Sequence, residues 1–69
     1  MSDNSEGQVR HERHGHILKI IIDNVPKKNS FVPAMMEQLA AALTLLESDD
    51  DLWVGVLCAM GDHFTAGLD

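Results

Sequence analysis

The chain has 69 residues, a size at which one hydrophobic core buries little surface and stability is marginal. Its composition, 45% hydrophobic and 23% charged, is typical of a globular protein and argues against a disordered one. A net charge of −6 and an aromatic content of 4% disfavour nucleic acid as a partner, because phosphate binding needs cations and base stacking needs aromatic rings.

Several features bear on location. No stretch reaches the roughly 20 apolar residues that a membrane span requires, and residues 1–10 lack the apolar run of a signal peptide. Cys58 is the single cysteine and cannot form an internal disulfide, which favours a reducing compartment. We therefore expect a cytoplasmic protein without a membrane partner.

Residues 1–7 are polar, show no hydrophobic period and are predicted to form a disordered tail.

Two strands are predicted after this tail. Polar and apolar positions alternate from Gln8, and residues 16–22 (HILKIII) are rich in β-branched side chains. Gly15 lies between them, where a tight hairpin turn needs a positive φ. The sequence thus predicts a β-hairpin with His14 and Gly15 at its tip. The second strand should end before Pro26, because proline cannot donate a hydrogen bond to the sheet.

A helix is predicted after a polar loop at residues 27–30. Pro33 suits the first helical position, although Val32 before it is a poor N-cap. The helix should end by Ser48, because three consecutive aspartates follow and helix carbonyl ends favour cations. Steps of three and four residues define the face expected to be buried, formed by Met36, Leu39, Leu43 and Leu46.

The apolar run of residues 52–59 predicts a strand covered on both faces. A helix connecting it to the hairpin makes the two neighbouring strands parallel, so the fold class is α/β. Such a strand needs more sheet and another layer than one hairpin and one helix supply. Residues 60–69 follow its carboxyl end, where open α/β sheets bind their ligands.

The order and spacing of these parts, from Val9 to Asp69, resemble the enoyl-CoA hydratase/isomerase, or crotonase, superfamily. The parts are the hairpin, the Pro26–Asn29 loop, the Met-Leu-Ala helix, the acidic corner at 47–51, the apolar strand and the final GDHFTAGLD. The last segment looks like the family's F-x-A-G-x-D signature. The resemblance implies a crotonase-like (ClpP/crotonase) spiral of ββα units, of which residues 8–69 would be an incomplete N-terminal part.

The resemblance also implies roles for single residues. Acyl-CoA chemistry places negative charge on a thioester oxygen, and preorganised backbone N–H groups stabilise that charge. By resemblance, the Leu68 N–H is one such oxyanion donor, and the second lies beyond Asp69. The Ala66 carbonyl is expected to contact the adenine amino group, with Gly67 forming the corner between them. Lys28, and as a second candidate Lys27, are expected to bind CoA phosphates.

Structural alternatives stand beside these roles. Gly67 taken alone fits a simple strand-to-helix corner, and a lysine pair in a loop is usually solvated surface. Asn29 is expected to tie its loop to the helix start, and Asp69 to organise the corner instead of acting as a base. A metal site is disfavoured because no ligand spacing is completed around the histidines, which are His11, His14, His16 and His63. A catalytic role for His63 is disfavoured because, by resemblance, it lies in the loop before the signature, where the family varies.

The leading hypothesis is an acyl-CoA-binding enzyme of fatty acid metabolism that stabilises a thioester enolate. Hydration of a 2-enoyl-CoA (a lyase) and isomerisation of its double bond are the outcomes that the resemblance favours. Dehalogenation, decarboxylation and hydrolysis stay open, because other side chains choose the reaction in this fold. It also implies a homotrimer or hexamer and no cofactor, since CoA arrives with the substrate. One alternative is a non-catalytic relative that keeps the fold for CoA binding or subunit contacts. Another is a small acidic α/β module that is complete at this length.

Overall fold

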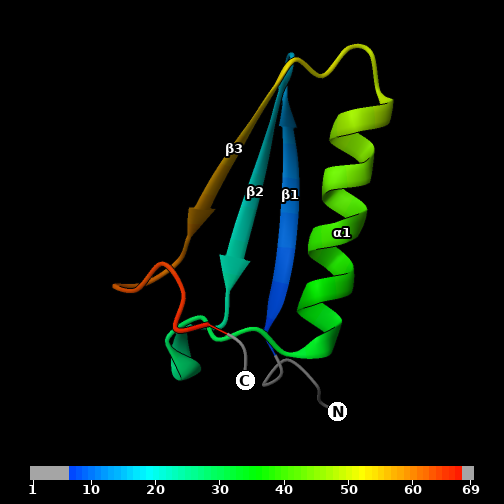
Figure 1. The fold of residues 1–69 in the computed structure, drawn as a ribbon. Coiled ribbons are helices and arrows are strands. Elements are labelled where there is room, and N and C mark those ends of the chain that lie inside the picture. Colours follow the sequence, from blue (N-terminus) through cyan, green and yellow to red (C-terminus); the bar gives the residue numbers. More distant parts are fainter. Residues whose placement is uncertain (1–6, 68–69) are drawn as a thin grey trace.

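The computed structural model describes residues 7–67 and contains a sheet with one helix along one face (Figure 1). Strands β1 (Gln8–His14) and β2 (Ile17–Asp23) form the antiparallel hairpin, and β3 (Val54–Ala59) pairs in parallel with β2. Between β2 and β3 lie a short 3-10 helix, Val25–Lys27, and helix α1, Pro33–Ser48. The sheet order β1-β2-β3 confirms the predicted α/β class and the parallel pair.

The hairpin tip differs by one residue from the expectation. His14 pairs with Ile17, so the two-residue turn is formed by Gly15 and His16 and not by His14 and Gly15. Gly15 has a φ of +62°, whereas His16 is not among the residues with positive φ. A type II′ turn needs positive φ at its first central residue only, and that requirement sets the glycine there.

Helix α1 has the predicted limits. Val32 is the N-cap in an extended conformation, with Pro33 following it, and no side chain caps the first turn. Asp49 is the C-cap, and its N–H donates to the Leu45 carbonyl. The side chain of Val32 is buried in the core instead of capping, which accounts for an apolar residue at this position.

The predicted buried face of α1 is wrong for two of its four residues. Met36 and Leu43 are 46% and 49% exposed, whereas Met35 is fully buried and Ala42 is 1% exposed. Leu39 and Leu46 do pack against the core, as expected. The sequence pattern favours the larger side chain at each step. The sheet instead approaches α1 closely enough that the small side chain of Ala42 fits where Leu43 was expected.

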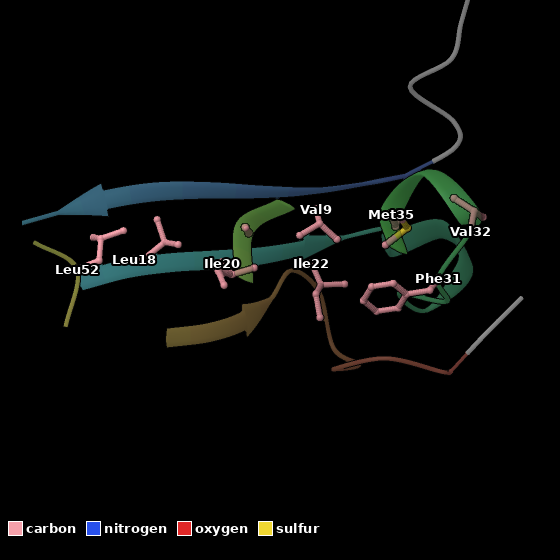
Figure 2. Packing of buried hydrophobic residues seen from close by; sticks show 9 residues of the cluster. Val9, Leu18, Ile20, Ile22, Phe31, Val32, Met35 and Leu52 are labelled. Carbon is pink, nitrogen blue, oxygen red and sulfur yellow. The ribbon is translucent and has the colours of Figure 1, made fainter. Parts of the chain in front are cut away.

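The core lies between α1 and the hairpin (Figure 2). Every second residue of β2 points into it, as the two-residue period of a strand requires. Phe31 and Val32 close the core at one end, and Leu52 lies at the other (Figure 2). The buried apolar side chains of this cluster are those of Val9, Leu18, Ile20, Ile22, Phe31, Val32, Met35, Ala42 and Leu52.

The expectation that β3 is covered on both faces is not met by residues 7–67. Val54, Val56 and Leu57 are exposed, and β3 forms an edge of the three-stranded sheet. The reason is that α1 packs against β1 and β2, so it covers only part of one face (Figure 1). Gly55 is exposed as well, although a Cβ there would lie 2.6 Å from a side-chain carbon of Leu46. Within residues 7–67, no helix has the length and apolar character that a membrane span requires.

Candidate functional site

Two loops meet at one edge of the sheet, where the parallel strands β2 and β3 have their carboxyl ends (Figure 1). The first loop covers residues 24–32 and the second covers residues 60–67. The sheet hydrogen bonding continues into the second loop, since the Met60 N–H donates to the Ile22 carbonyl at 2.9 Å. The carboxyl edge is the place where α/β sheets bind ligands, so these two loops form the candidate site.

Asn29 holds the two loops together. Its side chain is 1% exposed, and its Nδ2 donates to the carbonyls of Met60 at 2.7 Å and His63 at 2.5 Å. Its Oδ1 accepts from the Asn24 N–H at 2.6 Å. A carboxamide has two donor hydrogens, and both are used here. The expectation that Asn29 ties its loop to the helix start is wrong, because its side chain joins the first loop to the second loop.

The first loop has an unusual backbone. Lys28 and Asn29 have φ values of 55° and 60°, so two consecutive non-glycine residues are left-handed. Asn29 suits this conformation better than Lys28, because asparagine tolerates it and most other residues do not. The Asn24 carbonyl accepts from the N–H groups of Lys27 at 3.0 Å and Asn29 at 2.8 Å, which closes the loop into a compact turn.

The two candidate lysines have different surroundings. Both lysines are exposed, but Lys28 lines a hollow of about 250 Å³ between the loops and Lys27 does not. The hollow therefore contains one cationic side chain, one carboxylate and one imidazole, the last two from Asp62 and His63. Its complete lining is Val25, Pro26, Lys28, Asn29, Met60, Gly61, Asp62 and His63.

The corner predicted at Gly67 follows in sequence after His63, the last residue that lines the hollow. Gly67 has a φ of +100°, and a Cβ there would meet nothing within 4 Å. Glycine is thus required for its backbone conformation and not for lack of space. The Phe31 N–H donates to the Gly67 carbonyl at 2.8 Å, so the corner is tied to the first loop. Ala66 is exposed beside it. Leu68 and Asp69, for which roles are expected, lie outside the described residues.

Thr65, which is not among the predicted site residues, takes part in this network. Its Oγ1 donates to the Asn29 carbonyl at 2.6 Å and accepts from the Gly67 N–H at 3.0 Å. Short hydroxyl side chains commonly bond to backbone groups two residues away, and this tendency was the available signal. Its partner Asn29 is 36 residues away in sequence, so no pattern within a short stretch of the chain could have predicted this contact.

The histidines lie in separate environments. His14 contacts Glu12 at 3.0 Å, and His16 bonds to the Asp51 carbonyl at 2.7 Å while stacking on Trp53. His63 is in the loop that lines the hollow. Within residues 7–67 no three side chains of the histidine, cysteine or carboxylate type gather as a metal-ligating group.

The carboxyl groups with shifted pKa values belong to the hairpin-tip end of the sheet. The hydrogen bond from His14 lowers the pKa of Glu12. The Asp51 N–H, and then Arg13, lower the pKa of Asp49. Both groups are in the region of the hairpin tip and the helix end, so these shifts describe the scaffold and not the candidate site.

Comparison with known proteins identifies relatives of this chain, although no family model matches the sequence. It is 38% identical over 55 residues to a Mycobacterium tuberculosis protein named as the enoyl-CoA hydratase EchA13, a match that covers 80% of the chain and 17% of that protein.

Solved structures with a similar fold carry names of the same enzyme type. An enoyl-CoA hydratase/isomerase from Mycobacterium paratuberculosis superposes with a TM-score of 0.86 at 31% identity, over 94% of this chain and 26% of the other. An enoyl-CoA hydratase from Mycobacterium tuberculosis superposes with a TM-score of 0.86 at 35% identity, over 90% and 25%. The chain thus spans about a quarter of the solved structures it matches. Together with the fold, these matches show that the chain belongs to the enoyl-CoA hydratase/isomerase (crotonase) superfamily.

Proposed function

We propose that this chain forms part of an acyl-CoA enzyme of the enoyl-CoA hydratase/isomerase type and supplies one side of its thioester site. The observation that supports this most is the glycine corner at Gly67, which is tied by hydrogen bonds at the carboxyl edge of the sheet, next to the hollow that contains Lys28. A backbone corner with no Cβ lets a ligand approach closely, as an anion site made from N–H groups requires.

The proposed chemistry is electrostatic. Removing a proton beside a thioester, or adding water to its conjugated double bond, moves negative charge onto the thioester oxygen. A backbone N–H already aimed at that oxygen stabilises the charge, and losing one such donor costs about 3 to 4 kcal/mol in acyl transfer. We assign this donor to Leu68, directly after the glycine corner. A second donor and the catalytic carboxylates would come from outside residues 7–67.

The binding roles follow from the hollow. Lys28 is the better of the two lysines for a CoA phosphate, because it lines the hollow whereas Lys27 does not. The Ala66 carbonyl would accept from the adenine amino group. Hydration of a 2-enoyl-CoA or isomerisation of its double bond is the proposed reaction, with CoA brought in by the substrate and no further cofactor. Residues 8–69 would then form part of a larger crotonase-like domain, assembled as a homotrimer or hexamer in the cytoplasm.

Calorimetric titration with crotonyl-CoA tests the binding proposal. Lys28→Gln should weaken binding about tenfold, since it removes a charge-assisted contact to phosphate, and the loss should shrink as salt is added. Lys19→Gln is the matched control, because it makes the same charge change on strand β2. It should alter affinity by less than about twofold. Equal effects of the two variants would show Lys28 to be solvated surface. No heat of binding to the unsubstituted chain would overturn the acyl-CoA assignment.

A further inference from the structure

The hollow between the two loops contains three ionisable side chains, and its net charge depends on one of them. Lys28 comes from the first loop, whereas Asp62 and His63 come from the second. A lysine and an aspartate contribute opposite charges that cancel. The hollow is therefore neutral as a whole while the His63 imidazole is neutral, and it becomes cationic once this imidazole takes up a proton.

These three side chains are accessible to a ligand. Within residues 7–67 none of them has a hydrogen-bond or ion-pair partner, and all three are exposed. Asn29, which also lines the hollow, is buried and uses its carboxamide atoms within the protein. Charged contacts to an anion in the hollow would therefore come from Lys28 and a protonated His63, with Asp62 opposing them.

Asn29 connects the backbone of the two residues that can carry positive charge. Lys28 precedes it directly in the chain, and its Nδ2 donates to the His63 carbonyl at 2.5 Å. The second loop also approaches the first closely at Gly61, where a Cβ would lie 3.2 Å from the side chain of Val25. The backbone positions of Lys28 and His63 are thus fixed relative to each other, although their side chains are exposed.

The other charged groups near this end of the sheet do not line the hollow. Lys27 is adjacent to Lys28 in the chain but lies outside the lining, and Arg10 and Asp23 form an ion pair with each other. An imidazole changes its charge between about pH 5 and pH 8, whereas carboxylate and ammonium groups keep theirs. Among the described lining residues, His63 is therefore the group that changes the charge of the hollow in this range.

We propose that His63 makes the binding of a CoA phosphate in this hollow pH-dependent, because its protonated imidazole adds a second cation to that of Lys28. Asp62 is the opposing charge that weakens phosphate binding while His63 is neutral. This inference rests on the proposed function, since it assumes that the anion is a phosphate of CoA. A protonated imidazole donates a charge-assisted hydrogen bond to phosphate, which is stronger than a neutral one. The role is one of binding and not of catalysis.

Titration calorimetry with CoA at about pH 5.5 and about pH 8 tests this role. His63→Gln should match the affinity of the unsubstituted chain within about twofold at the higher pH and bind about fivefold more weakly at the lower one. Both proteins meet the same ligand at each pH, so protonation of CoA itself cancels from the comparison. His11→Gln, the same change at an exposed position of β1, is the matched control and should follow the unsubstituted chain at both pH values.

Asp62→Asn is the second variant. It removes the opposing charge and should tighten CoA binding about threefold at the higher pH, with a gain that shrinks as salt is added. Asp50→Asn makes the same charge change at an exposed position near the helix end and should give less than about half of that gain.

Equal affinities of His63→Gln and the unsubstituted chain at the lower pH would overturn the role of His63 while leaving the proposed function intact. Equal gains in Asp62→Asn and Asp50→Asn would also overturn the inference, because the effect would then reflect the net charge of the chain and not the hollow. If CoA binds to the unsubstituted chain at neither pH, the proposed function fails, and this inference fails with it.

Discussion

The two ends of the sheet are held by different kinds of contact. At the hairpin tip, exposed charged and aromatic side chains connect the elements: Arg13 pairs with Asp49 at 2.8 Å, and His16 stacks on Trp53, which is 70% exposed. At the loop end an ion pair between Arg10 and Asp23 also joins β1 to β2, but the two loops are held together by neutral hydrogen bonds to backbone carbonyls, and the asparagine that makes several of them is buried.

This difference indicates where the structure is most sensitive to substitution. An exposed ion pair contributes little, because water screens it and ordering two long side chains costs entropy. A buried amide is different, since removing it leaves backbone groups without partners in a place that water cannot easily reach. The loop end should thus depend on single residues far more than the tip does.

The largest expected effect is at Asn29. Asn29→Gly keeps the left-handed backbone accessible but leaves the partners at Asn24, Met60 and His63 unpaired, so we expect a loss of about 3 to 5 kcal/mol in unfolding free energy. Asn29→Ala should lose about 1 kcal/mol more, because alanine is strained at a φ of 60°. Urea unfolding followed by circular dichroism measures both. A loss below about 1 kcal/mol in Asn29→Gly would contradict the view that this side chain holds the loops.

A smaller effect is expected at the hairpin tip. Gly15→Ala places a Cβ in open space but at a φ of +62°, so only the backbone is strained, and the expected cost is about 1 to 2 kcal/mol. His14→Ala, one residue earlier on the exposed end of β1, is the control and should stay within about 0.5 kcal/mol. The fluorescence of Trp53 follows unfolding at this end. A Gly15→Ala cost equal to that of Asn29→Gly would remove the contrast between the two ends.

The smallest effect concerns pH at the tip. The Asp51 N–H and Arg13 lower the pKa of Asp49 from its ordinary value of 3.8. A carboxyl with a lowered folded pKa stabilises the fold above its ordinary pKa, and this contribution disappears as the pH falls through the folded value. Asp49→Asn should therefore flatten the fall in the urea midpoint below pH 3.8. Asp50→Asn, an exposed neighbour with the same charge change, is the control. Identical acid profiles for the two variants would argue against the Asp49 contacts.

Much of the scaffold could be predicted from local patterns. Pro33 and the aspartates after Ser48 mark the two ends of α1, and the β-branched run marks β2. The hairpin tip was misplaced by one residue, because alternation does not show which central turn position the glycine takes. The prediction that β3 is buried on both faces is also wrong for residues 7–67, since an apolar run does not show which elements pack against a strand. The site predictions for Lys28 and Leu68 stay predictions.

By itself, the sequence determined which segments form strands and helix, because propensity, period, proline and glycine act within a few residues of the chain. Only the tertiary structure decided that Ala42 faces the sheet in place of Leu43, since the helix turns to give the closest packing and not the largest side chain. It also decided that Asn29 and Thr65 meet across 36 residues. That contact exists because two parallel strands bring their following loops to one edge, a juxtaposition that no short window of sequence contains.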